Sequence, residues 1–141
     1  MSTADAIGAA VCFGWLGMVL AISFLETPLK FRAPDVTLRI GLGIGRLVFR
    51  ALNSVEAVLA AVLVVTLVLD PPSTLPVVGA AVAVLALLAQ VVAVRPRLTA
   101  RTNLVLGGAD APRSRVHYAY VALELAKVVG LVVSGSALLA R

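Results

Sequence analysis

Four apolar stretches follow one another along the chain, each of roughly twenty residues, with polar segments between them. They cover residues 7–25, 47–69, 77–94 and 116–139. An α-helix rises 1.5 Å per residue, so about 20 apolar residues cross the roughly 30 Å hydrocarbon layer of a bilayer. The pattern therefore predicts an all-α, polytopic bundle of four membrane-spanning helices, with residues 1–141 forming a single integral membrane domain.

The composition favours lipid over water as the solvent of this chain. Apolar residues make up 61% and charged residues 13%, against about 45–50% and about 25% in soluble domains. A soluble domain of this size buries only about two-thirds of its surface, which is too little for a mean hydropathy of +1.06. These values exclude a soluble enzyme and a disordered chain. A cleaved signal peptide is disfavoured because Asp5 is the only charged residue before the first stretch.

Basic residues gather in two of the connecting segments, residues 26–46 and 95–115, which hold nine of the twelve. The nine are Lys30, Arg32, Arg39, Arg46, Arg95, Arg97, Arg101, Arg113 and Arg115. Cytoplasmic loops of membrane proteins carry an excess of Lys and Arg. We therefore expect both loops in the cytoplasm and both termini on the outer side of the plasma (inner) membrane. The net charge of +5 then reflects membrane orientation, and no nucleic-acid partner is expected.

The basic loops are predicted to contact the headgroups of anionic lipids. In the 26–46 loop, apolar and charged residues alternate, which fits either a short interfacial segment or a plain solvated connector. Glycines at the entrance to the second span allow close packing or a bend. The expected headgroup contacts are Lys30, Arg32, Arg95, Arg97 and Arg101.

Two spans carry polar side chains on one helix face. The spacing of three or four residues brings the members of each set onto one side of a helix. Lipid exposure of Arg50 and Glu56 would cost roughly 5–7 kcal/mol. This nearly cancels the free energy gained by inserting the apolar residues of that span into the membrane. The two faces are therefore expected to meet. The set consists of Arg46, Arg50, Asn53 and Glu56 in the second span and His117, Tyr120, Glu124 and Lys127 in the fourth.

Depth in the membrane indicates specific partners within this set. Counted at 1.5 Å per residue from the cytoplasmic ends of their helices, Glu56 and Lys127 both lie about 15 Å deep. Arg50 and Glu124 lie at shallower levels, about 6 and 10 Å. We therefore predict the ion pairs Glu56–Lys127 and Arg50–Glu124.

Two functions from different classes fit this pattern. In the first, the polar cluster lines a site for an ion, proton or small solute in a channel or transporter-like protein. In the second, paired charges lock the bundle of a non-transporting accessory or assembly subunit, or of an anionic-lipid-binding scaffold. Small residues in the spans favour a homo-oligomer or a partner membrane protein.

No enzyme, cofactor or metal site is expected from the sequence. Ser54, Ser134 and Ser136 lack the neighbouring His and acid of a catalytic triad. The chain has one cysteine and one histidine, and the predicted topology places Cys12 and His117 near opposite membrane surfaces. A metal site within one chain would need more ligands than these.

Four short motifs resemble those of a family of small four-helix membrane proteins of unknown function, the bacterial relatives of a eukaryotic transmembrane-protein family. The motifs are FLETPLKF at 24–31, GRLVF at 45–49, RPRL at 95–98 and HYAY at 117–120. The resemblance implies a four-helix integral membrane domain and emphasises Pro28, Arg46, Phe49, Pro96 and His117. It implies no reaction or substrate.

Overall fold

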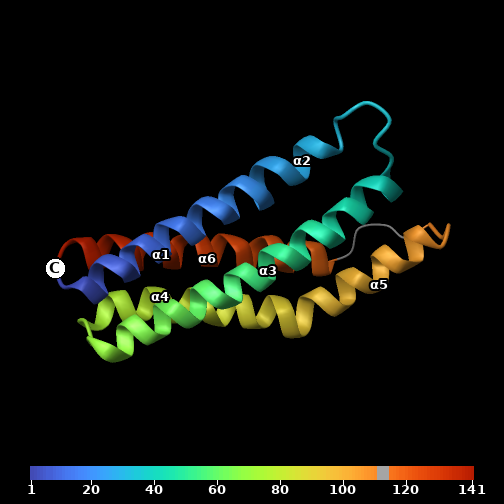
Figure 1. Cartoon of the computed structure of the whole chain (residues 1–141). Helices are drawn as coiled ribbons and strands as arrows, with labels where there is room; N and C mark the ends of the chain where they lie inside the picture. The colour runs from blue at the N-terminus through green and yellow to red at the C-terminus, as the bar shows by residue number, and fades with distance from the viewer. Residues whose placement is uncertain (111–114) are drawn as a thin grey trace.

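The computed structural model describes residues 1–110 and 115–141. Within these ranges the chain forms four long helical runs, each long and apolar enough to cross a membrane (Figure 1). They are Thr3–Lys30, Leu38–Leu69, Thr74–Leu106 and Arg115–Leu139. The predicted all-α fold with four candidate spans is confirmed. Arg113 and the rest of 111–114, within the predicted 95–115 loop, lie outside the described residues.

Two of the four runs contain a π-helical segment. The first consists of α1 (Thr3–Val19), the π-helix η1 (Leu20–Glu26) and the short α2 (Thr27–Lys30). The second is the single helix α3 (Leu38–Leu69). The third consists of α4 (Thr74–Ala89), the π-helix η2 (Gln90–Val94) and α5 (Arg95–Leu106), and the fourth is α6 (Arg115–Leu139).

The helices extend well beyond the apolar stretches at the basic end. Helix α3 begins at Leu38, where the Thr37 hydroxyl caps it by accepting a hydrogen bond from the backbone N–H of Ile40. Much of the predicted 95–115 loop is α5. Pro28 and Pro96 stand in the first turn of α2 and α5, directly after a π-helix. Proline is tolerated there because the wider π-turn relieves the clash between its ring and the preceding carbonyls.

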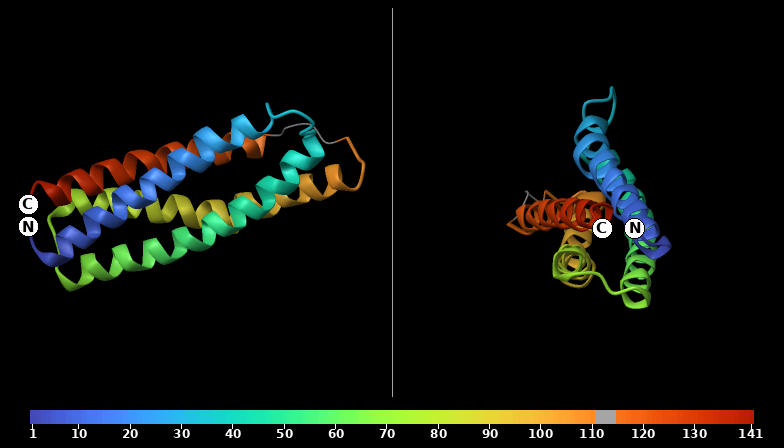
Figure 2. Two further views of the ribbon diagram at one scale, coloured as in Figure 1. Left: turned by 45° about the horizontal axis from the view of Figure 1, so that its top comes forward. Right: turned by 90° about the vertical axis from the view of Figure 1, so that its left-hand side faces the viewer.

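Both chain termini lie at one end of the bundle, as Figure 2 shows. The α3–α4 turn lies at the same end, where the Ser2 hydroxyl donates to Asp70 at 2.5 Å. Arg141 forms an ion pair with Asp5 at 2.6 Å. We call this the terminal end and the opposite one the basic end. The structure thus agrees with termini on one side of a membrane, and which side they face stays a prediction from loop charge.

Glycine lets α4 and α6 pack closely. A Cβ atom on Gly79 would lie 2.7 Å from the Gly130 carbonyl oxygen, and one on Gly130 would lie 2.6 Å from that of Gly79. Ser134 Oγ donates to the Pro76 carbonyl at 2.9 Å nearby. Because a methyl group at either glycine would overlap the other backbone, the small residues set this helix separation. Gly14, by contrast, has no neighbour within 4 Å of its Cβ position.

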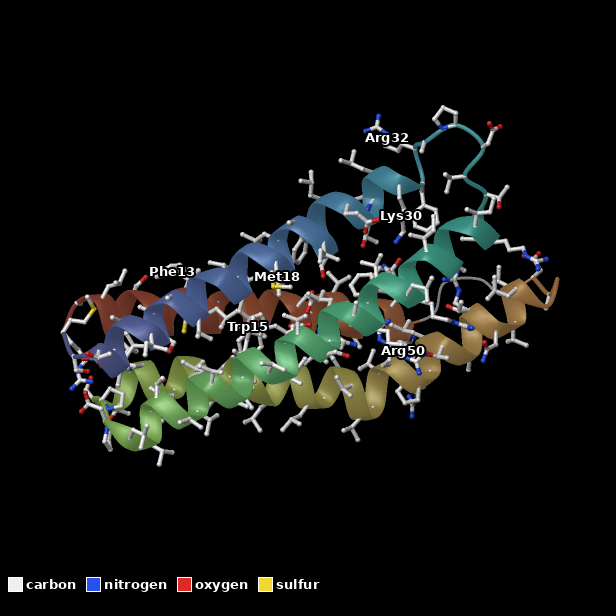
Figure 3. All side chains as sticks on the ribbon, in the orientation of Figure 1. Phe13, Trp15, Met18, Lys30, Arg32 and Arg50 are labelled. Carbon is white, nitrogen blue, oxygen red and sulfur yellow. The ribbon has the colours of Figure 1, made fainter. Side chains whose placement is uncertain are left out.

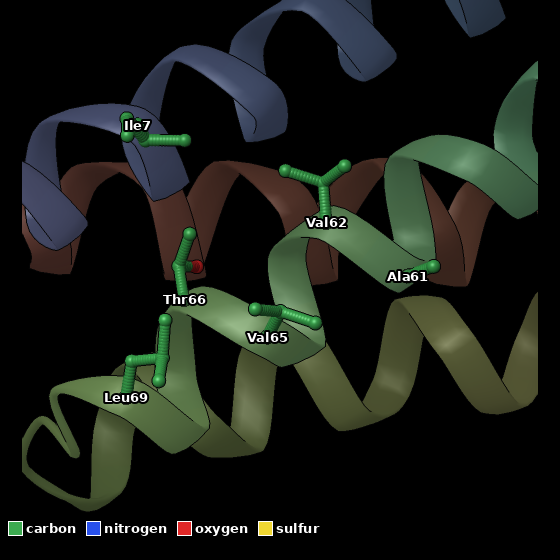
Figure 4. Close-up of a pocket in the computed structure, with 6 residues that line it drawn as sticks. All are labelled: Ile7, Ala61, Val62, Val65, Thr66 and Leu69. Atoms are coloured by element: carbon green, nitrogen blue, oxygen red, sulfur yellow. The ribbon is translucent and has the colours of Figure 1, made fainter.

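The outer surface of the bundle is apolar. A groove of about 380 Å³ lies between α1 and α3, and Figure 4 shows the side chains that line it. Its lining residues are Ile7, Ala61, Val62, Val65, Thr66 and Leu69. The hydroxyl of Thr66 is satisfied within α3, because it donates to the Leu63 carbonyl at 2.7 Å. Such a surface suits contact with lipid acyl chains.

Candidate functional site

Lys127 binds two carboxylates in the interior of the bundle. Its Nζ lies 2.6 Å from Glu56 Oε2 and 2.6 Å from Glu124 Oε1. The three side chains are only 0–2% exposed. The predicted Glu56–Lys127 ion pair is confirmed, because the two residues lie at the same depth and their helix faces meet.

All four candidate spans contribute a hydrogen-bonding side chain to this site. Trp15 of α1 lies between α1 and α3 (Figure 3), and its Nε1 donates to Glu56 Oε2 at 2.7 Å. Gln90 Nε2, from the third run, donates to Glu124 Oε1 at 2.8 Å. Ser23 Oγ donates to Glu124 Oε2 at 2.5 Å. We call Trp15, Ser23, Glu56, Gln90, Glu124 and Lys127 the central cluster.

The predicted Arg50–Glu124 pair is wrong. Both oxygens of Glu124 are occupied by the donors just described, and Arg50 is exposed on α3. At about 100° per residue, Arg50 and Glu56 lie about 120° apart around the helix. The buried side of α3 follows Phe49, Leu52 and Glu56, so Arg50 lies outside it.

The central cluster lies near the middle of the spans. Lys127 is the midpoint of the 25-residue helix α6. Glu56 lies thirteen residues before Leu69, the end of α3, which is about 20 Å at 1.5 Å per residue. In a bilayer with a hydrocarbon layer of roughly 30 Å, this places the cluster inside that layer, about 20 Å from its edge at the terminal end and about 10 Å from its other edge.

A second group of cationic and aromatic side chains lies toward the basic end. The Arg95 guanidinium carbon is 5.0 Å from the ring centre of Phe49 and 4.9 Å from that of Tyr120. The two rings meet edge to face at 5.7 Å. Lys30 Nζ lies 5.9 Å from the Phe49 ring centre. Together with Arg46, one turn before Phe49 on α3, these residues form what we call the basic site.

Several N–H groups of the basic site have no hydrogen-bond partner among the described residues. They include the buried Nε and Nη2 of Arg95 and the buried Nε of Arg46. Arg46 Nη2 does donate to the Asn103 side chain on α5. Lys30 Nζ is 3.7 Å from a carboxylate oxygen of Glu26. The arginines are thus held in place while part of their hydrogen-bonding capacity stays free.

Helix length places the basic site at the edge of the hydrocarbon layer. About 20 residues span roughly 30 Å. Counting that many residues from the terminal end leads to Phe49 in α3 and to Val94, next to Arg95, in the third run. In α6 the same count from Leu139 leads to Ala119, next to Tyr120. The residue counts along these three runs therefore place the basic site at the same depth.

Five further predicted site residues lie outside both groups. Asn53 is half-buried, and its Oδ1 has no donor within the described chain. His117 is half-buried with its ring edge-on to Tyr118 at 5.7 Å. Arg32 and Arg97 are exposed, and Arg101 is half-buried. Tyr120, predicted with the charged residues, belongs to the basic site, and its hydroxyl lacks a partner in the described ranges.

Sequence reasoning missed three members of the central cluster, namely Trp15, Ser23 and Gln90. Gln90 had a usable signal, because it is the only strongly polar residue in the stretch 77–94. Such a residue in a span is expected to hydrogen-bond across helices. Trp15 and Ser23 are common in membrane helices, and nothing in their spacing distinguishes them.

Comparisons with known proteins add no further assignment. The chain matches no family model, no curated protein and no solved structure. The family that the four motifs resemble is therefore not identified by these comparisons. In the structure, all four motifs meet at Phe49, through Lys30, Phe49 itself, Arg95 and Tyr120. Among the described residues, no group of His, Cys, Asp and Glu side chains is arranged to hold a metal ion.

Proposed function

We propose that this protein is a non-transporting, non-catalytic membrane scaffold that binds the phosphate of an anionic lipid headgroup at the basic site. The observation that supports the proposal is the pair of arginines, Arg46 and Arg95, with buried N–H groups that lack an acceptor. A buried donor without a partner is costly. A phosphate group offers several acceptor oxygens together with negative charge, and it matches the planar fork of a guanidinium.

The level of the basic site suits a lipid headgroup. Phe49, Arg95 and Tyr120 lie where about 30 Å of helix ends, which is where lipid phosphates begin. The rings of Phe49 and Tyr120 hold the Arg95 guanidinium in place by cation–π contact. Under the loop-charge prediction this end faces the cytoplasm, where the leaflet carries anionic lipid.

The central cluster supports the non-transporting part of the proposal. Its charged side chains are 0–2% exposed and bonded across all four spans. We therefore interpret the cluster as a clamp that fixes helix order and depth. A proton channel or transporter would acidify or alkalinise liposomes along an imposed gradient. We expect purified protein in liposomes loaded with a pH-sensitive dye to give the proton flux of empty liposomes, and a faster flux would contradict the clamp.

Lipid binding is tested by native mass spectrometry of protein released from nanodiscs that contain equal amounts of phosphatidylglycerol and phosphatidylcholine. We expect selective retention of phosphatidylglycerol. Arg95→Gln should weaken its binding about tenfold or more, because it removes charge-assisted hydrogen bonds of about 1.5–3 kcal/mol. Arg32→Gln is the matched control, since it removes one positive charge from an exposed position of the same end.

The outcomes separate the proposal from its rivals. Equal retention of both lipids, or equal effects of Arg95→Gln and Arg32→Gln, would contradict the built site. Competition by inorganic phosphate without any preference for phosphatidylglycerol would assign the site to a soluble phosphate compound instead. A membrane protein that co-purifies at fixed stoichiometry, lost on Arg95→Gln, would favour the assembly-subunit alternative.

A further inference from the structure

The central cluster contains one more negative than positive group. Glu56 and Glu124 both contact Lys127 at 2.6 Å, and the other bonded members, Trp15, Ser23 and Gln90, are neutral. With both carboxylates ionised, the cluster would carry a net charge of −1 near the middle of the spans. An unbalanced charge there is strongly disfavoured, and an ionisable group responds by taking the neutral form. The cluster therefore needs one further positive charge.

The hydrogen bonds distinguish the two carboxylates. Both oxygens of Glu124 accept, Oε1 from Lys127 and Gln90 and Oε2 from Ser23. Glu56 accepts only at Oε2, from Lys127 and Trp15, and its buried Oε1 has no partner in the described part of the chain. A carboxylate is stabilised by donors at both oxygens, whereas a neutral carboxyl group needs them less. Glu124 thus has the surroundings of the ionised form.

We propose that Glu56 binds a proton on Oε1, which makes the central cluster a proton-binding site that is neutral as a whole. The proton converts the carboxylate of Glu56 into a carboxylic acid and is taken from water when the bundle assembles. A carboxylic acid donates one hydrogen bond. Gln90 Oε1 is the other oxygen of the cluster that is buried without a donor among the described residues, so the cluster also has an unused acceptor.

Charged and titratable groups on the packed elements do not remove the need for this proton. Arg95, at the start of α5, lies over the Phe49 and Tyr120 rings, and no hydrogen bond or ion pair joins it to Glu56 or Glu124 within the described residues. The Tyr120 side chain is neutral at physiological pH. A bound metal cation would need about six oxygen ligands, and the cluster has only two buried oxygens without donors, those of Glu56 and Gln90.

Infrared spectroscopy tests the proton directly. The full-length protein is measured at neutral pH in a maltoside detergent, which has no carbonyl group. Exposed carboxyl groups are ionised at this pH, so a C=O stretching band of a carboxylic acid reports a buried one. We expect one such band, which shifts to lower frequency in D₂O. Its absence from the wild-type spectrum would overturn the proposal without any variant.

Glutamine substitutions test which residue holds the proton. Glu56→Gln keeps a neutral side chain beside the Lys127–Glu124 pair, so we expect loss of the infrared band with an unchanged unfolding temperature. Glu124→Gln forces the negative charge onto Glu56, whose Oε1 lacks a donor, so the unfolding temperature should fall. Glu26→Gln is the control, because the Glu26 carboxylate is partly exposed, and this variant should keep the band. A Glu56→Gln protein that is as destabilised as Glu124→Gln, or that fails to fold, would overturn the assignment to Glu56.

Discussion

The central cluster and the basic site both collect charged side chains from several spans, but their cations differ in the acceptors they find. In the cluster, Lys127 donates to both Glu56 and Glu124, and Glu124 accepts at both oxygens. In the basic site, Arg46 and Arg95 keep buried N–H groups that no described residue accepts. The two groups lie only about two turns apart, because Glu56 follows Phe49 by seven residues in α3.

Depth explains the difference. Near the middle of a bilayer no water is available, so a charge there must find its partners within the chain. At the edge of the hydrocarbon layer, headgroups and water supply partners from outside. A buried cation that bonds to acidic side chains of its own chain thus indicates a structural role, whereas immobilised donors without acceptors at the membrane edge indicate a ligand.

The largest effect is expected from removing the ammonium group of the central cluster. Lys127→Met removes the cation that Glu56 and Glu124 both contact. It leaves the Glu124 carboxylate buried without a positive partner, and breaking a buried ion pair in this way costs about 3–5 kcal/mol. The free energy of unfolding, measured by denaturant titration in detergent micelles, should fall by this amount. Fluorescence of Trp15, the only tryptophan of the chain, reports the transition because Trp15 bonds to Glu56.

A lysine-to-methionine substitution in the basic site is expected to have a much smaller effect. Lys30→Met removes a cation of the basic site whose ion pair with the partly exposed Glu26 is long, at 3.7 Å, so we expect a stability change below about 1 kcal/mol. The double variant with Glu56→Lys and Lys127→Glu keeps the charges of the cluster and should recover part of the loss caused by Lys127→Met. No recovery would count against the Glu56–Lys127 clamp.

A smaller effect is expected from separating α4 and α6. Gly130 lies one turn after Lys127, and a Cβ atom there would meet the Gly79 carbonyl oxygen at 2.6 Å. Overpacking of this kind costs about 1–3 kcal/mol, partly offset by the better helix propensity of alanine. We expect Gly130→Ala to lower the unfolding temperature and to shift the Trp15 emission, because Gln90 and Lys127 move apart with their helices.

Gly14→Ala is the matched control for that substitution. Its Cβ position has no neighbour within 4 Å, so only the gain in helix propensity remains, and stability should stay the same or rise slightly. Equal destabilisation by the two variants would show that the α4–α6 contact does not hold the cluster together.

The four spans and one ion pair could be predicted from the sequence because both depend on simple geometry. Apolar length gave the spans, and a rise of 1.5 Å per residue placed Glu56 and Lys127 at one depth. The predicted Arg50–Glu124 pair was wrong because similar depth does not ensure that two side chains point toward each other. Residues within a 120° arc form one polar side of a helix, but only those that face the interior of the bundle contact a partner side chain.

The extent of the helices could not be predicted because the first and third spans were taken to end with their apolar stretches, at Leu25 and Val94. Pro28 and Pro96 each follow a π-helix in the structure, and the chain continues as α2 and α5. Apolar periodicity does not reveal a π-turn, which adds a residue to one turn only. The basic site depends on α2 and on the start of α5, since these helices bring Lys30 and Arg95 to Phe49. The sequence therefore predicted the basic residues as lipid contacts without predicting that they meet.

The smallest effect is expected from a substitution at Phe49. It measures how much the aromatic contact with Arg95 contributes to lipid binding, apart from the N–H groups of the guanidinium. Phe49→Leu removes one of the two rings beneath Arg95 and leaves Tyr120 in place. A cation–π contact at a partly exposed position is worth about 0.5–1 kcal/mol, so phosphatidylglycerol should bind roughly two- to fivefold more weakly in the native mass spectra. Phe13→Leu, near the terminal end beside Gly135, should leave lipid binding unchanged. A loss as large as that of Arg95→Gln would mean that aromatic packing, rather than the guanidinium donors, carries the affinity for lipid.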